Sequence, residues 1–429
     1  MIAIVVTFDS LRLDSLGCYG SQWDQTPYFD RLAAESVTFD QHFSVDALAG
    51  WTRDGSFWSE LSSAGVGLTL VSEEGSLLAA EASRLERDTG ATCRSVVSTY
   101  GLSMNESDMP FARLTALVDE ELARSLAGPH QNSLLWIGSV GVPEPWLPPR
   151  PYGCLYLEDV DRLQNEIRDA GNAILDGRPL RKYALNRLDH FLTSHASSHS
   201  PEQAETADAI TDEDNFDAWC VRRAVHAGFV SVLDKSFGRL YELLCALLAG
   251  REWMLIVTAA EGRSLGGDRL SANPLPKLRE ETVHTPLWIR TARPEEAHWL
   301  GGRRQQLAHA GDLPATVLDG FGIELRAAAP SGLSWLPAVE QPLDGQTPGR
   351  DRLLFRSVNG ESARTSEFHF VRSAPASETT DIQEALFLKP DDPFEVHDVR
   401  AEYPGVCDEL RELLTDTDQQ VAARNSDPS

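Results

Sequence analysis

The sequence predicts an α/β protein: a large, mainly parallel β-sheet sandwiched by helices, followed by a small C-terminal antiparallel sheet and a helix. Apolar runs of strand length alternate with helical patterns from residue 1 to about 325, which is typical of parallel strands buried on both faces. The first run, Ile2 to Thr7, leads to Asp9, and open α/β sheets place their chemistry at such strand ends. A short β-rich segment and a leucine-rich helix complete the pattern.

Periodicity locates the individual elements. Buried strands are expected over residues 66–71, 133–139, 253–258 and, less regularly, 286–290. The clearest helix covers residues 222–248, where apolar side chains from Val225 to Phe237 recur at helical spacing. The C-terminal region predicts strands over 353–358, 367–372 and 384–389, then a helix over 403–414.

Composition divides the chain into a main domain, a linker and a subdomain. We expect the α/β domain over 1–326, a proline-rich linker over 327–349, a β-rich subdomain over 350–415 and a tail over 416–429. Within the main domain, residues 158–217 are polar and acidic and predict a surface excursion. Its histidines, His190, His195 and His199, are interpreted as solvated, with a metal site as the alternative.

Charge and cysteine usage limit the partners. The 429 residues carry a formal net charge of −27, which argues against a nucleic-acid partner because a phosphate backbone requires a basic face. The chain enters its first strand without a signal-peptide pattern, and no run approaches the roughly 18 apolar residues of a membrane helix. Six scattered cysteines without CxxC spacing indicate neither zinc nor disulfides. These features predict a cytoplasmic protein that does not enter a membrane.

The first fifty residues contain several collinear motifs. After Asp9 come Gly17-Cys18-Tyr19-Gly20, Thr26-Pro27 and Asp30-Arg31-Leu32-Ala33. They resemble the opening of the sulfatase branch of the alkaline phosphatase superfamily, and Asp391-Asp392-Pro393 with Glu402-Tyr403-Pro404 resembles its ending. The resemblance implies metal-dependent sulfate ester hydrolysis. In that family an aspartate on the first strand and an Asp-His or Asp-Asn pair after a later strand hold the metal, and a Cys/Ser-x-Pro-x-Arg element supplies the nucleophile.

The nucleophile element is where this chain first departs from the family. Ala49-Gly50-Trp51-Thr52-Arg53 stands at its place, and only Arg53 matches. Ala49 occupies the nucleophile position, but a methyl group cannot attack an ester. Ser44, Thr52 or Ser56 could substitute after a shift in register. Arg53 could still bind an anion, or it could be an ordinary surface arginine.

The expected metal ligands are also altered. Asp9 is where the resemblance places the first ligand; capping of the following loop is the alternative. Thr258-Ala259-Ala260-Glu261-Gly262 stands where active relatives have Thr-Ser-Asp-His-Gly, so that Ala260 replaces the aspartate and Glu261 the histidine. Asp9 and Glu261 together would hold Mg²⁺ or Ca²⁺ only weakly, and we expect no resident cofactor. Pro143 replaces a further histidine that the family carries in a Pro-His-x-Pro loop.

Two basic remnants complete the candidate site. His284 matches a segment near the family's substrate pocket, with structural hydrogen bonding as the alternative, and Lys277 lies near the expected leaving-group lysine. The departures fall on chemical positions while the scaffold motifs are kept. The sequence therefore predicts a sulfatase-like pseudoenzyme that binds a partner protein or a small anionic ligand. One alternative is an active sulfuric or phosphoric ester hydrolase with a non-standard site built on Asp9, Glu261, Arg53 and His284; another is a structural role through dimerisation.

Overall fold

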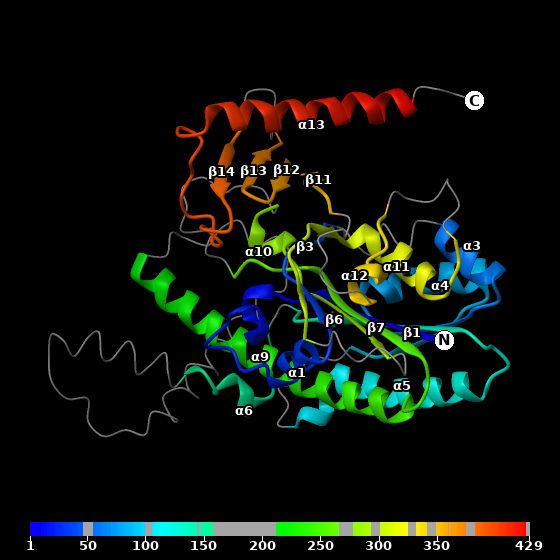
Figure 1. The fold of residues 1–429 in the computed structure, drawn as a ribbon. Helices are drawn as coiled ribbons and strands as arrows, with labels where there is room; N and C mark the ends of the chain where they lie inside the picture. The colour runs from blue at the N-terminus through cyan, green and yellow to red at the C-terminus, as the bar shows by residue number, and fades with distance from the viewer. Residues whose placement is uncertain are drawn as a thin grey trace, which may run out of the picture.

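An eight-stranded sheet, in the order β5-β4-β6-β1-β7-β8-β2-β9, forms the centre of the main domain (Figure 1). The computed structural model describes residues 1–45, 55–98, 105–143, 146, 148–157, 212–265, 278–292, 301–324, 332–340, 349–358, 360–374 and 382–425. Strand β8 runs antiparallel to its neighbours β7 and β2, and the other pairings in this sheet are parallel. The predicted, mainly parallel sheet is therefore confirmed.

The strands of this sheet include the predicted first strand, β1, and the four further strands that the sequence predicts. Those four are β4 (Gly67–Glu73), β6 (Ser133–Gly141), β7 (Trp253–Glu261) and β8 (Leu287–Ala292). The others are β1 (Ile2–Ser10), β2 (Val37–Phe39), β5 (Thr92–Val96) and β9 (Arg303–Arg304). Because β1 lies between β6 and β7 at the centre, its carboxyl end is flanked on both sides by parallel strand ends.

Helices cover both faces of the sheet, and the alternation of β1 shows why. Its even-numbered residues, such as Phe8, pack against one layer, whereas Ala3 and Val5 pack against the other. The first layer consists of α1 (Pro27–Ala34), α5 (Pro110–Ala127) and α9 (Asp212–Leu247). The second consists of α3 (Gly55–Ser63), α4 (Leu77–Thr89), α11 (Leu313–Gly320) and α12 (Leu336–Glu340). Helix α9 contains nearly all of the predicted helix 222–248.

Helix α9 is fixed to its neighbours at two points. A Cβ on Gly228 would lie 2.1 Å from the carbonyl oxygen of Tyr152 in α6 (Arg150–Gly153), so that only glycine permits this crossing. Asp234 accepts hydrogen bonds from the N–H groups of Tyr28 and Phe29 (2.8 Å to the latter) at the start of α1. The carboxylate therefore caps α1 from another helix, as suits the positive end of a helix dipole.

A second, antiparallel sheet forms the C-terminal subdomain, in the upper part of Figure 1. Its strands are β11 (Arg352–Ser357), β12 (Gly360–Thr365), β13 (Phe368–Ser373) and β14 (Glu384–Leu388). Helix α13 (Pro404–Asn425) covers one face through Cys407, Leu410 and Leu414. The other face packs on Phe43 and Val283 of the main domain. The sequence predicted β11, β13, β14 and the start of α13, which continues past Leu414 to Asn425.

Shorter elements link the two sheets. Strand β3 (His42–Phe43) pairs with β10 (Ala308–His309), and α10 (Glu280–Val283) precedes β8. Single 3₁₀ turns span Leu13–Ser15, Gly17–Tyr19, Glu106–Asp108 and Ala310–Asp312. In the part of the chain that the structure describes, no helix has the length and apolar character needed to cross a membrane.

Candidate functional site

Asp9 stands at the carboxyl end of β1, level with Val140 on β6 and Ala260 on β7. The flanking pairs fix this register, since Ser10 lies opposite Gly141 on one side and Glu261 on the other. Residues that are level on parallel strands share a face of the sheet, and the next residue along points to the other face. Asp9 and Ala260 therefore share one face, and Glu261 shares the opposite face with Ser10.

The carboxylate of Asp9 binds the first turn of a helix. Its Oδ2 accepts a hydrogen bond of 2.9 Å from the N–H of Leu77, the first residue of α4, whereas its Oδ1 is buried and has no hydrogen-bond partner among the described residues. Burial raises the pKa of Asp9 to about 7; the Leu77 N–H opposes this rise, and the charges of Glu73 and Glu261 add to it. Asp9 thus has one acceptor atom available to a proton or a cation.

Glu73 is a second carboxylate at this edge of the sheet, and the sequence analysis missed it. It lies fully buried at the end of β4, where it accepts hydrogen bonds from the hydroxyl of Ser139 (3.1 Å) and the N–H of Val140 (3.3 Å). An acidic residue that closes a buried strand, like Asp9 itself, was the signal available in the sequence. The negative charge of Glu73 makes the surroundings of Asp9 unfavourable for an anion.

The structure does not bring Glu261 to the same face as Asp9. The side chain of Glu261 is 59% exposed, with its Oε1 3.9 Å from the guanidinium of Arg263. The two carboxylates that the sequence predicts as a weak metal pair thus leave β1 and β7 on opposite faces of the sheet.

Ser44, a substitute nucleophile in the sequence analysis, donates hydrogen bonds to backbone carbonyls. Its hydroxyl donates a hydrogen bond to the carbonyl of Ala260, and its N–H donates to the carbonyl of Val283 (2.8 Å). Ser56 lies in the first turn of α3, and Pro143 follows the end of β6. Ala49, Thr52, Arg53, Lys277 and the three histidines of the acidic excursion lie outside the described residues.

His284 makes structural hydrogen bonds with both ring nitrogens. Nδ1 lies 2.8 Å from Oε1 of Glu280, and Nε2 lies 2.8 Å from the carbonyl oxygen of Asp40. The ring also stacks on Phe43, with centroids 4.6 Å apart. Because both nitrogens face oxygen acceptors, the geometry favours the structural alternative for His284 over contact with a substrate.

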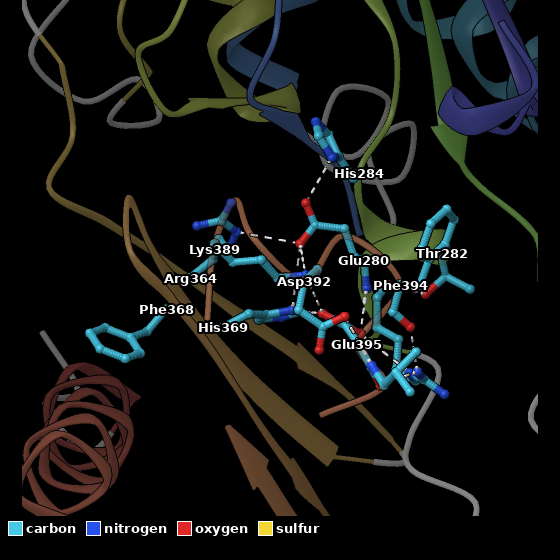
Figure 2. A network of polar contacts seen from close by, with 12 residues as sticks. Glu280, Thr282, His284, Arg364, Phe368, His369, Lys389, Asp392, Phe394 and Glu395 are labelled. Carbon is cyan, nitrogen blue, oxygen red and sulfur yellow. Dashed lines mark hydrogen bonds and ion pairs between the residues drawn. The ribbon is translucent and has the colours of Figure 1, made fainter. Parts of the chain in front are cut away.

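A buried cluster of ionisable residues lies between α10 and the C-terminal sheet (Figure 2). Glu280, His369 and Glu395 each offer a ligand atom within 4.8 Å of the others, and they are the one such metal-compatible group in the ranges that the structure describes. However, Nζ of Lys389 lies 2.9 Å from Oε2 of Glu280 and 3.2 Å from Oε1 of Glu395. No local sequence pattern indicates this cluster, because its members are up to 115 residues apart.

No protein-family model matches the sequence, and a search of curated proteins also finds no match. Solved structures do match. A phosphonate monoester hydrolase of Agrobacterium radiobacter has 16% sequence identity and a TM-score of 0.63, with 97% of this chain and 95% of that chain covered. A putative sulfatase from Bacteroides thetaiotaomicron has 14% identity and a TM-score of 0.62, covering 99% and 94%.

A further structure, of a protein in complex with its substrate D-glucosamine-2-N,6-O-disulfate, has 16% identity and a TM-score of 0.62, covering 99% and 98%. At these identities the likeness establishes the fold, and the coverage shows that it extends over nearly the whole chain. The chain therefore has the fold of this phosphonate monoester hydrolase and this putative sulfatase.

Proposed function

We propose that this protein is a sulfatase-fold pseudoenzyme, which has lost metal-dependent ester hydrolysis and acts by binding a partner protein or a small anionic ligand. The observation that carries the proposal is that Asp9 lies level with Ala260, between the pairs Phe8–Ala259 and Ser10–Glu261. A methyl group lies level with the one carboxylate retained at the centre of the sheet. Divalent cations such as Mg²⁺ and Ca²⁺ require several oxygen ligands; Ala260 supplies none, and the nearby Glu73 already accepts hydrogen bonds from Ser139 and Val140.

The contacts around Asp9 support the same proposal. The N–H of Leu77 occupies one of its oxygens, so a helix terminus takes part of the stabilising role that a metal would have. Glu261, the other acidic candidate, belongs to the opposite face. The nucleophile position adds a separate argument, because Ala49 has no group that could attack sulfur or phosphorus.

Electrostatics separates the two binding roles. An anion next to Asp9 would face the charges of Asp9 and Glu73, so an anionic ligand requires basic groups further out, for which Arg53 is our candidate. A partner protein needs no such pocket. An alternative function, an ester hydrolase with a non-standard metal site, is favoured by one observation: the buried Oδ1 of Asp9 has no hydrogen-bond partner among the described residues.

A hydrolysis screen tests the proposal. The purified chain is assayed with 4-nitrophenyl sulfate, 4-nitrophenyl phosphate, a phenylphosphonate monoester and D-glucosamine-2-N,6-O-disulfate, each with Mg²⁺, Ca²⁺, Mn²⁺ and Zn²⁺. Asp9→Asn and Glu261→Gln serve as paired variants. We expect no turnover that depends on Asp9. Metal-dependent turnover that is lost in Asp9→Asn would contradict the proposal and establish the hydrolase.

Thermal shifts test the binding role. Sulfate, phosphate and the disulfated glucosamine are added to the wild type and to Arg53→Gln, since a ligand that binds only the folded state raises Tm by mass action. A shift in the wild type that Arg53→Gln abolishes supports the anionic ligand. If none of these anions raises the Tm of the wild type, the anionic-ligand role is excluded and the partner-protein role remains.

A further inference from the structure

Lys389 lies in the middle of the buried cluster that links the two sheets, as Figure 2 shows. We propose that its ammonium group is the resident cation of the Glu280–His369–Glu395 site: it occupies the place of a divalent metal and fastens the C-terminal sheet to the main domain. This inference is independent of the proposed function, because it concerns residues remote in sequence from Asp9 and from the nucleophile position.

The geometry of the ammonium resembles that of a bound cation. Nζ of Lys389 lies 2.9 Å from Oε2 of Glu280 and 3.2 Å from Oε1 of Glu395, and it donates a hydrogen bond of 2.9 Å to the carbonyl of Asp392. The ammonium thus forms ion pairs with two carboxylates and has a carbonyl oxygen as a third neighbour. The side chains of Lys389 and Glu395 are each 1% exposed, which removes the competition of water.

The histidine of the site faces the carboxylates with its Nδ1 and is bound to one of them. Nδ1 of His369 donates a hydrogen bond to Oε1 of Glu395 and lies 3.9 Å from Oε2 of Glu280. A nitrogen that donates a proton has no lone pair for a metal. The side chain therefore serves as a donor to the carboxylates, like the ammonium beside it.

The fixed charges also oppose a metal. Arg364 places Nε 3.5 Å from Oε2 of Glu280, and Arg279 places Nε 3.3 Å from Oε2 of Glu395. With Lys389 these arginines give three permanent positive charges against two carboxylates, before either histidine is counted. A divalent ion would add two further positive charges in a buried region, where like charges repel strongly.

The network joins two parts of the chain that are far apart in the sequence. Arg279, Glu280 and His284 belong to α10 and its flanks in the main domain, whereas the other partners come from β12, β13 and the chain after β14. Glu395 also accepts a hydrogen bond from the backbone N–H of Glu280 (3.1 Å), and its own φ of 55° is unusual for a non-glycine residue. The ion pairs hold this strained backbone in place.

The test compares Lys389→Met with a matched control, Lys235→Met. Lys235 also pairs with a glutamate, Glu106, at 2.6 Å, but its side chain is 43% exposed. We expect Tm to fall by about 5 °C in Lys389→Met, because one partner of a buried ion pair is lost, and by roughly 1 °C or less in the control. Amide hydrogen exchange is expected to accelerate in β13 and to stay unchanged in β1.

Metal addition tests the identity of the cation. Removal of the ammonium frees Oε2 of Glu280 and Oε1 of Glu395, so Zn²⁺ or Mn²⁺ at about 1 mM is expected to raise Tm in Lys389→Met and to leave the wild type unchanged. Adding Glu395→Gln to Lys389→Met is expected to abolish that rise. The chelator EDTA is expected to leave the Tm of the wild type unchanged.

Two results would overturn the inference. One is that Lys389→Met and Lys235→Met have equal Tm, or that Lys389→Met has the lower Tm but Zn²⁺ and Mn²⁺ do not raise it. The other is that the wild type binds one metal per chain, that Asp9→Asn retains it and that Glu395→Gln loses it. This measurement needs only the folded wild type and two single variants. That outcome would make the cluster a true metal site.

Discussion

Asp9 and Ala260 lie level with each other on neighbouring parallel strands, between the pairs Phe8–Ala259 and Ser10–Glu261. In the sulfatase pattern that the sequence resembles, both positions carry metal-binding carboxylates, and here residue 260 is alanine. The sheet delivers both residues to the same face at its carboxyl edge, so the difference from that pattern concerns the side chain at residue 260 and not its backbone position.

Restoring a carboxylate at residue 260 is expected to create a metal site. Ala260→Asp places a second carboxylate level with Asp9 and should lower the free energy of unfolding by about 2–4 kcal/mol without metal, through desolvation and repulsion between the two carboxylates. Millimolar Mn²⁺ or Ca²⁺ should then raise Tm. The measurement is a thermal melt with each ion and with EDTA.

Ala259→Asp is the matched control for this variant. Ala259 is equally buried on β7 but faces the opposite layer of helices. Ala259→Asp should lose a similar amount of unfolding free energy, and metal should not raise its Tm. A metal-dependent rise of equal size in both variants would show that the faces have been wrongly assigned.

Ala49→Cys alone is expected to produce no sulfatase activity. A thiol at this position supplies a potential nucleophile, but Ala260 and Pro143 still deprive the site of the aspartate and histidine that the family uses. Hydrolysis of 4-nitrophenyl sulfate above the wild-type background checks this. Turnover from the single change would mean that a functional metal site is already present.

Gly228 is expected to tolerate no side chain. Gly228→Ala would place a Cβ 2.1 Å from the backbone oxygen of Tyr152, which cannot move without shifting α6, so we expect a loss of about 2–3 kcal/mol in unfolding free energy. Gly405, in the first turn of α13, has no atom within 4 Å of such a Cβ. Gly405→Ala should be neutral or stabilising by about 0.5–1 kcal/mol. Urea unfolding of both variants distinguishes these effects, and equal losses would refute the close crossing.

Asp234 is expected to make stability fall as pH rises. Burial raises its pKa to about 7, against the opposing N–H groups of Phe29 and Tyr28. The folded state therefore retains a proton that the unfolded chain releases near pH 4, so the contribution of this group to stability is lost as pH rises from about 4 to 7.

Replacement of Asp234 by asparagine isolates this effect. In Asp234→Asn, the change in the free energy of unfolding between pH 5 and pH 8 should be smaller than in the wild type by about 1–3 kcal/mol, measured by urea unfolding. The exposed Asp319 of α11 provides the control: Asp319→Asn should keep the wild-type slope. A wild-type slope in Asp234→Asn would show that this carboxylate is ionised in the folded protein throughout that range.

The sequence predicted the elements whose pattern is local. Buried strands such as β6 and β7, and the long helix α9, carry continuous or periodic apolar residues that need no tertiary information. Strand β12 was not predicted because Glu361, Ser362 and Arg364 interrupt any apolar alternation. Of these side chains, Glu361 lies within ion-pair distance of Arg356, and Arg364 within ion-pair distance of Glu280.

The candidate site was harder to predict because it depends on register and on distant partners. The sequence placed Asp9 and Glu261 at two strand ends, but one residue of register decides whether two side chains share a face. The ion network around Lys389 joins residues from α10 and from the C-terminal sheet, and no local pattern indicates that they meet. For His284 the sequence left a pocket role and a structural role open, because its hydrogen-bond partners, Glu280 and the carbonyl of Asp40, become neighbours only in the folded chain.

The most direct test of the central claim is the metal content of the purified protein, measured by elemental analysis after dialysis against Mg²⁺, Ca²⁺, Mn²⁺ or Zn²⁺, together with the shift in Tm. Because Asp9 stands beside Ala260, we predict less than stoichiometric metal and no shift that depends on Asp9. One metal per chain in the wild type, lost in Asp9→Asn, would contradict the pseudoenzyme account.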